Sequence, residues 1–297
     1  MGRPDRPLDP ADRSPRLGGL EPARRRGHGR RPDPPEPIAV LHDWHAWWAG
    51  TQDGRLSTLV DYPDVLRAWH RALWQAHLTT DFAQPEHDLT PYPVVVVHRL
   101  YALTDAAVDN LLGYVRQGGT LVCGFQSGVA DEDDRVRPGG MDARLRELFG
   151  IRTLHEWWPL EAGETVPCEG FHGSLWSEEL GADGTADETV RYKGGELDGL
   201  PAILRKGRAW YLSTLPEPEA LRDLLARITS GAGVRPVLDG LPEQVEAVRR
   251  GELLFVLNHG REPVTVEVPG THHDLLTGEA LTDRVTLGRY GVAVLRP

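Results

Sequence analysis

The sequence predicts an α/β fold in which an open parallel sheet has helices on both faces, followed by a small antiparallel β-sandwich domain. Between residues 38 and 232, short unbroken apolar runs alternate with segments of helical periodicity, a pattern typical of parallel strands connected by helices. Over residues 233–297, short alternating runs are separated by Gly, Pro and Asn, which indicates antiparallel strands. The length of 297 residues is sufficient for both domains.

Apolar runs mark the strands of the first domain, and capping residues mark its helices. The runs IAVL and VVVV contain no polar residue, as expected for strands that are buried on both faces. Val65, Trp69 and Leu73 recur at helical spacing and define the apolar face of one helix. The expected elements are, in order, strand 38–41, helix 61–77, strand 79–82, strand 94–97, a helix capped by Thr104 and Asp105, strand 120–125, and a helix over 141–149 that ends at Gly150.

The rest of the chain adds a hairpin, one more helix and the second domain. Two strand-like pieces, PAILRK and RAWYLS, flank a turn at Lys206 and Gly207. A helix with an apolar face at Leu221, Leu225 and Ile228 closes the first domain. The strands expected in the second domain are ELLFVLNH, EPVTVEV, HHDLL, DRVTL and GVAVLRP.

Residues 1–37 differ in composition from the rest of the chain. They are rich in Pro, Gly and Arg and contain almost no large apolar side chains. Such a segment buries too little surface to offset the entropy of ordering it, so we expect it to be disordered. The cluster Arg24, Arg25 and Arg26 could contact a nucleic acid or another anion, but we favour a solvated tail.

Composition and charge exclude several classes of protein. The net charge of −11 argues against a nucleic-acid backbone or an anionic membrane surface as the main partner. Two cysteines are too few for a disulfide framework or a Cys-based zinc site. There is no apolar stretch of membrane-spanning length, no secretory signal and no nucleotide-binding glycine motif. We therefore expect a cytoplasmic protein without a cofactor.

No catalytic set stands out in the sequence. Cys123 lies in the apolar run TLVCGF, which favours a buried strand position over a nucleophile, and Ser127 has no evident base. His42, Asp43 and His45 are close enough in sequence for a metal site, although we favour a surface loop after the first strand. The sequence therefore assigns no catalytic residue and no metal ligand.

Tryptophans are the most informative candidates for binding. Asp43, Trp44, Trp47 and Trp48 follow the first strand, in a predicted loop at the edge of the sheet where open α/β folds usually place ligands. Aromatic faces stack on sugar rings, so carbohydrate contact is one interpretation. Since tryptophan is also enriched at protein interfaces, packing against another domain or subunit is the interpretation that we favour.

The ordered series of motifs resembles the trimerisation domain of family 42 glycoside hydrolases, the β-galactosidases. The similar segments are AVLHDWHAWWA, DYPDVLRAWHRALWQAHLTTDF, VVVVHRLYALTDAAVDNLLGYVRQGGTLVCGFQSG and DEDDRVRPGG. The segments LLFVLNHGREPVTVEVPG, DLLTGEAL and GVAVLRP resemble the small C-terminal β domain of that family. The resemblance covers residues 38–297. His45, where an acidic residue is expected, and Cys123, where a small aliphatic residue is usual, depart from the pattern.

The resemblance implies a flavodoxin-like domain, similar to class I glutamine amidotransferases, over 38–232, and a β-sandwich over 233–297. It implies a homotrimer that supports catalytic barrels and walls their active sites. The glutamates that hydrolyse terminal β-galactosides in this family lie on an N-terminal barrel of about 250 residues, for which residues 1–37 leave no room. We therefore expect a truncated or frameshifted gene product without activity of its own, whose barrel is missing or encoded separately. The alternatives are a stand-alone carbohydrate-binding or regulatory protein that uses Trp44–Trp48, and an amidotransferase-like enzyme that uses Cys123.

Overall fold

The computed structural model describes residues 36–55 and 57–297. The arginine cluster and nearly all of the segment predicted to be disordered lie outside these residues. Glu36, which we assigned to that segment, is buried, and its backbone N–H donates a hydrogen bond to the Asp81 carboxylate at 2.9 Å. The described fold therefore includes a residue that lies two positions before the predicted boundary.

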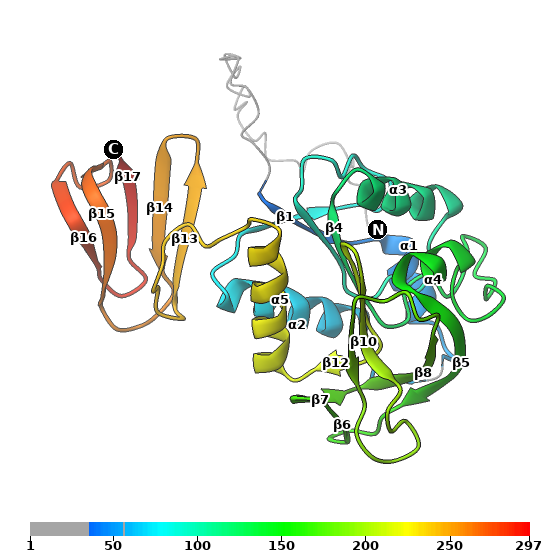
Figure 1. The fold of residues 1–297 in the computed structure, drawn as a ribbon. Helices are drawn as coiled ribbons and strands as arrows, with labels where there is room; N and C mark the ends of the chain where they lie inside the picture. Colours follow the sequence, from blue (N-terminus) through cyan, green and yellow to red (C-terminus); the bar gives the residue numbers. More distant parts are fainter. Residues whose placement is uncertain (1–35, 56) are drawn as a thin grey trace, which may run out of the picture. The chain divides into compact units, whose positions relative to one another are not determined.

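A seven-stranded sheet forms the centre of the first domain (Figure 1). Its strand order is β2-β1-β3-β4-β11-β10-β9, in which the first five strands are parallel and the last two are antiparallel. The strands are β1 (Ile38–Leu41), β2 (Thr80–Ala83), β3 (Val94–Val97), β4 (Thr120–Gly124), β9 (Glu188–Arg191), β10 (Pro201–Lys206) and β11 (Ala209–Leu212). The parallel sheet is confirmed. The predicted hairpin joins its last parallel strand, β11, to the antiparallel strand β10, and β9 forms the edge beyond β10.

Helices cover both faces of this sheet, as predicted. The helices are α1 (Trp44–Gly50), α2 (Tyr62–Gln75), α3 (Asp105–Arg116), α4 (Ala143–Phe149) and α5 (Pro218–Gly231). Alternate residues of β1 and β3 point to opposite faces, because side chains alternate along a strand. Leu41 and Val97 join the core under α3 and α4, whereas Val40 and Val96 join the core under α2 and α5.

Helix ends are fixed by the residues that the sequence placed there. Thr104 accepts a hydrogen bond from the Ala107 N–H at 3.0 Å and begins α3, as expected for an N-cap. Asp61 and Asp142 cap α2 and α4 in the same way. Gly150 ends α4 in the left-handed region at φ 74°, which glycine adopts without strain.

Two small sheets lie beside the large one. Strands β5 (Ile151–Pro159) and β8 (Trp176–Ala182) form an antiparallel pair, and β12 (Leu215–Pro216), β7 (Phe171–Ser174) and β6 (Thr165–Cys168) form a three-stranded sheet. The sequence showed little periodicity in this region. Irregular pairing explains this, because the register of β5 on β8 shifts twice.

The C-terminal segment differs from the predicted sandwich. Its strands are β13 (Val245–Arg250), β14 (Leu253–Asn258), β15 (Val264–Asp274), β16 (Ala280–Leu287) and β17 (Val292–Arg296). Hydrogen bonds join all five in one antiparallel sheet of order β13-β14-β17-β15-β16, so the segment does not consist of two separate sheets. The register between β15 and β16 shifts after Glu267, and Val266 and Val268 pack in one core with Val245 and Val256.

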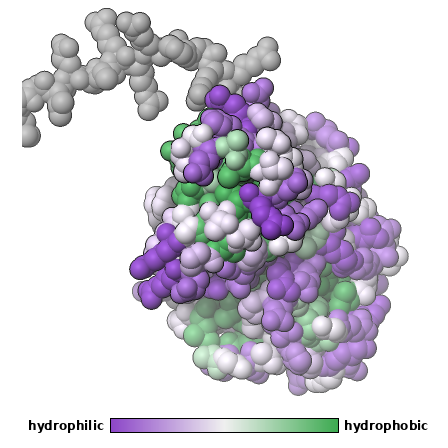
Figure 2. All heavy atoms as spheres, turned by 90° about the vertical axis from the view of Figure 1, so that its left-hand side faces the viewer, coloured by the Kyte–Doolittle hydropathy of each residue, from purple (hydrophilic) through white to green (hydrophobic). Residues whose placement is uncertain are grey.

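Within residues 36–55 and 57–297, no helix combines the length and apolarity needed to cross a bilayer. Figure 2 shows hydrophobic areas interspersed with hydrophilic side chains on one face of the molecule.

Gly124 ends β4 at the edge of the sheet where the candidate site lies, and its lack of a side chain is structurally required. A Cβ atom there would lie 2.3 Å from the backbone oxygen of His98, which cannot move without displacing β3. We expect Gly124→Ala to lower the free energy of unfolding by about 2 kcal/mol or more, measured by urea denaturation. Gly231→Ala is the control, because a Cβ at Gly231 meets no atom within 4 Å, and a change there as large as that of Gly124→Ala would contradict this explanation.

Candidate functional site

The candidate site lies at the carboxyl edge of the parallel strands. The strand order reverses at β1, which has β2 on one side and β3 on the other. In open α/β sheets the segments after two such strands diverge and leave a crevice where ligands bind. Asp43 follows β1, Arg99 follows β3, and Gln126 follows β4, so the chain delivers polar side chains to this edge from three neighbouring strands.

The four residues predicted for binding do come together, but on a short helix and not in a loop. Asp43 is the N-cap of α1: its carboxylate accepts a hydrogen bond from the Ala46 N–H at 2.7 Å. The backbone N–H of Asp43 donates to the Tyr62 hydroxyl at 3.0 Å. The N-cap explains why this segment is a helix and not the predicted loop. The Asp43 carboxylate satisfies a free N–H group of the first turn, so the tryptophans that follow can adopt helical backbone angles.

Tryptophans of α1 build an aromatic stack that reaches the surface. Trp44 stacks on Trp47 with ring centroids 5.1 Å apart, and Trp47 stacks on the buried Tyr62 at 5.5 Å. Trp44 is 49% exposed and Trp48 is 59% exposed. The stack therefore anchors two indole rings to the core while leaving them open to a partner or ligand.

A cavity of about 210 Å³ lies at the same edge. Its lining residues come from the segment after α1, from the ends of β3 and β4 and from β5, and they are Gly54, Arg55, Ser57, Arg99, Tyr101, Gln126, Val129, Val136 and Trp157. Ala49 at the end of α1 packs in one apolar cluster with Tyr101, Val129 and Trp157, so the tryptophan helix and the cavity share a wall.

Arg99 is the most unusual residue of the cavity. Its side chain is 2% exposed, its Nε donates to Gln126 Oε1 at 2.7 Å, and its Nη2 donates to the Gly50 carbonyl at 3.3 Å. Its Nη1 has no hydrogen-bond partner within the described residues. Burial lowers the pKa of Arg99 to about 10. The sequence did not single out this residue, although an arginine two residues after the end of the run VVVV was a usable signal.

The other arginine of the cavity is fully paired. Arg55 binds both carboxylate oxygens of Asp134 at 2.6 and 2.7 Å, and its Nε donates to the Ala49 carbonyl at 2.7 Å. Its guanidinium also lies 4.5 Å from the ring centre of Tyr101. This pair closes the loop after β4 over one side of the cavity.

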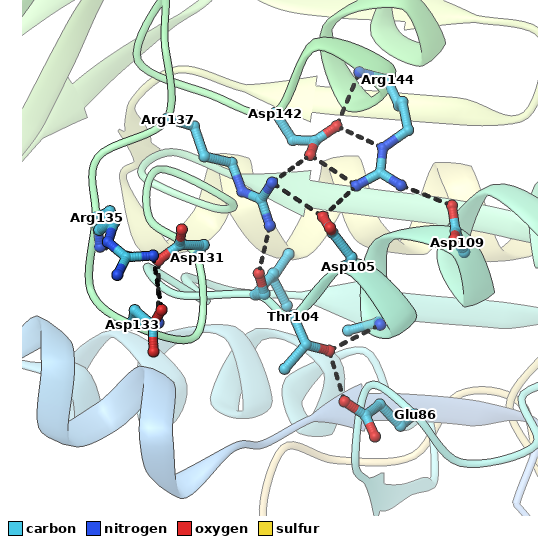
Figure 3. A network of polar contacts seen from close by, with 12 residues as sticks. Glu86, Thr104, Asp105, Asp109, Asp131, Asp133, Arg135, Arg137, Asp142 and Arg144 are labelled. Atoms are coloured by element: carbon cyan, nitrogen blue, oxygen red, sulfur yellow. Dashed lines mark hydrogen bonds and ion pairs between the residues drawn. The ribbon is translucent and has the colours of Figure 1, made fainter.

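An ion network holds that loop in place (Figure 3). Arg137 contacts Asp142 at 2.9 Å and Asp105 at 3.1 Å, and Arg144 contacts the same two carboxylates and Asp109 at 2.7–2.9 Å. Asp142 is the least exposed member of this network, and hydrogen bonds from Arg144 oppose its desolvation, so its pKa is lowered. The network joins α3 to α4 and fixes the segment that carries Val129 and Val136.

Gln126 connects the cavity to a buried carboxyl group. Its backbone N–H donates to Glu178 Oε1 at 3.1 Å, and Glu178 also accepts from Trp176 Nε1 at 3.2 Å and from the Tyr211 hydroxyl at 2.7 Å. Burial raises the pKa of Glu178 to about 7, although these hydrogen bonds act in the opposite direction. The Glu178 carboxyl group thereby fixes the backbone of the segment that follows β4.

The candidates for nucleophile and metal ligand are buried or engaged elsewhere. Cys123 is buried in β4, burial raises its pKa to about 12, and its thiol donates a weak hydrogen bond to the Gly124 carbonyl at 3.7 Å, as expected for a structural strand residue. Ser127 is also buried and donates to the same carbonyl at 2.8 Å. Among residues 36–55 and 57–297, no group of three His, Cys, Asp or Glu side chains could hold a metal ion.

A second, larger hollow of about 350 Å³ is lined by Asp43, Glu86 and Glu132, among other residues. Two of them already serve the scaffold, since Asp43 caps α1 and Glu86 accepts from the Thr104 hydroxyl at 2.5 Å. This hollow therefore presents no free pair of carboxylates for the acid–base chemistry of sugar hydrolysis.

The chain matches two family models of known proteins, in order. Residues 36–235 match the family model described as the β-galactosidase trimerisation domain, and residues 244–297 match that of the β-galactosidase C-terminal domain. The chain belongs to the family 42 β-galactosidases, as the resemblance predicted, and represents the part of that family without the barrel.

Individual relatives agree with this assignment. The chain is 37% identical over 264 residues to a β-galactosidase from Arthrobacter sp. and 33% identical over 271 residues to the β-galactosidase LacZ from Heyndrickxia coagulans. These alignments cover 86% and 87% of this chain, but 37% and 40% of those proteins. The crystal structure of a β-galactosidase from Bacillus circulans sp. alkalophilus superimposes with a TM-score of 0.83 at 27% identity, over 88% of this chain and 41% of that one.

Glu178 gives a test of the polar group beneath the cavity. Folding favours its protonated form, because its pKa of about 7 in the folded protein exceeds the ordinary value of 4.5. This contribution to the free energy of unfolding is present in full below pH 4.5, and most of it is lost as the pH rises to about 7. The loss amounts to about 3 kcal/mol at most.

We expect Glu178→Gln, which resembles the protonated side chain, to remove this part of the pH dependence in urea titrations between pH 4.5 and 8. Glu179→Gln, at the next position of β8, is the matched control. An unchanged slope in Glu178→Gln would contradict the assignment.

Proposed function

We propose that this chain is the oligomerisation and support portion of a β-galactosidase-type glycoside hydrolase, and that it forms a homotrimer. The single observation that carries the proposal is the match of two supporting domains, in order, over residues 36–235 and 244–297. In this proposal, hydrolysis of terminal β-galactosides takes place on a (β/α)8 barrel that belongs to another part of the protein or to another chain.

The architecture supports a role as scaffold. The order β2-β1-β3-β4-β11 of the parallel strands is that of a doubly wound, flavodoxin-like sheet, which we infer is shared with amidotransferase-like domains. Such a domain could carry chemistry at its carboxyl edge, but Cys123 lies buried in the strand there. A fold of this kind hosts many functions, so function must be argued from the site and not from the fold.

The exposed indoles of Trp44 and Trp48 support an interface at this edge. Tryptophans contribute strongly to protein interfaces. The Trp44 ring is held by its stack on Trp47 and Tyr62, and the Trp48 ring lies tilted against Trp44 at 6.2 Å, so Trp44 loses little conformational entropy on contact. We infer that a second copy of the chain or the catalytic barrel covers them. The free thiols of Cys123 and Cys168 agree with the reducing, cytoplasmic location that we propose.

The first test measures whether the chain alone hydrolyses a β-galactoside. The purified chain should hydrolyse o-nitrophenyl-β-D-galactoside no faster than buffer, because no free carboxylate pair lines its cavity. A β-galactosidase that contains its barrel, assayed in parallel, is the positive control. Turnover that copurifies with the chain through two unrelated chromatography steps would overturn the proposal.

Assembly through α1 is the second test. Size-exclusion chromatography with light scattering at micromolar concentration should give three times the chain mass of 32.9 kDa. We expect Trp48→Ala to weaken this assembly by about 30-fold in dissociation constant, the effect of removing one interface hot spot. Tyr290→Ala is the control, since Tyr290 is a similarly exposed aromatic residue on the C-terminal domain. A stable monomer of the unchanged chain would count against the trimer.

The same indoles also favour a second candidate function, carbohydrate binding by the chain itself. Their exposed faces could stack on a galactose ring. A saturable change of tryptophan fluorescence with lactose, lost in Trp48→Ala while assembly is unchanged, would support this candidate over the interface.

A further inference from the structure

The cavity beside α1 has a charge and hydrogen-bond pattern that the proposed assembly role does not require. We infer that it is a binding site for a single carboxylate group carried on a short apolar body. The inference rests on the residues that line the cavity, and it stands whether or not the chain forms a trimer.

Charge within the cavity is unbalanced. Arg55 and Arg99 bring two guanidinium groups. Within the part of the chain that the structure describes, Asp134 is the one carboxylate that contacts either of them, and both of its oxygens bind Arg55. Arg99 bonds only to neutral oxygens, those of Gln126 and Gly50. A buried charge without a counter-ion in contact is strongly unfavourable, so an anion bound at Arg99 would stabilise this arrangement.

Two residues that line the cavity carry donors without partners. Arg99 Nη1 and Trp157 Nε1 are both buried, and neither has a hydrogen-bond partner within the described residues. A guanidinium can only donate, so a ligand that reaches Arg99 in the cavity must offer acceptors. A carboxylate is the acceptor that a guanidinium binds most strongly.

Size and wall chemistry limit what the carboxylate is attached to. The volume of about 210 Å³ is below the range of about 300–1,000 Å³ that holds a larger organic ligand. Tyr101, Val129 and Trp157 give it apolar walls. A short fatty acid fits this description, and so does the side chain of Glu or Asp from a partner chain, which has the same chemistry.

The lowered pKa of Arg99 agrees with this assignment, because burial penalises the charged guanidinium more than the attraction of Tyr101 and Asp61 favours it. A bound anion would remove that penalty and stabilise the folded chain. Binding and stability are therefore expected to rise together.

Butyrate is the probe for the experiment. Titration of the full chain with sodium butyrate at constant ionic strength, followed by thermal unfolding and calorimetry, should show saturable binding and a rise in the unfolding temperature. Arg99→Met should bind butyrate about tenfold more weakly or worse, as expected when a charge-assisted hydrogen bond is lost. Arg208→Met, a substitution outside the cavity, is the control for general loss of positive charge.

A second pair of variants avoids any dependence on the folding of Arg99→Met. Val136 lines the cavity and is 54% exposed, so polar substitutions there should be tolerated. Val136→Glu places a carboxylate at the cavity and should abolish butyrate binding and raise the unfolding temperature, whereas Val136→Gln should do neither.

The source of the natural carboxylate follows from the same titration. If butyrate dissociates the assembled chain, the site accepts an acidic side chain from a second copy, and if the assembly is unchanged, the site accepts a free acid. Butyrate that produces no more effect than sodium chloride on the unchanged chain, or equal binding by Val136→Glu and Val136→Gln, would overturn the inference.

Discussion

Burial of the central strands on both faces is the constraint on which the rest of the structure depends. Every residue of β1 and β3 is buried, so neither strand can carry a charged side chain along its length. Polar groups therefore gather where the strands end, and His98 and Arg99 follow Val97 at once. The arrangement of strands then places these groups beside those that follow β1 and β4, at the point where the strand order reverses.

Two groups of polar contacts hold the segments at this edge of the sheet in place. The network of Arg137, Arg144 and Asp142 fixes the loop after β4, and Glu178 fixes the backbone of Gln126 from the core side. Exposed ion pairs contribute little stability individually, but here several charges share partners and one carboxylate is buried. Their consequence is a cavity with fixed walls beside a fixed tryptophan stack.

Such an edge suits recognition better than covalent chemistry. The nucleophile that the amidotransferase-like interpretation needs is a buried strand thiol. The carboxylates of Asp43 and Asp134 are already bound to a helix N–H group and to an arginine. The same edge carries two exposed indoles and the guanidinium of Arg99, whose Nη1 has no hydrogen-bond partner within the described residues. Aromatic and arginine side chains of this kind are those that dominate protein interfaces, in keeping with a domain that supports catalysis carried out elsewhere.

The sequence by itself determined the order and type of most elements, because these depend on local patterns. The runs IAVL and VVVV predicted buried strands, and Thr104 and Gly150 predicted where one helix begins and another ends. The ordered motifs identified the family. Only the tertiary structure decided which residues meet. Arg55, Arg99 and Trp157 are far apart in the chain and carry no local signal of proximity, so their cavity arises from strand order and loop closure. The single C-terminal sheet was also a tertiary outcome, since alternation predicts strands but not how hydrogen bonding joins them into sheets.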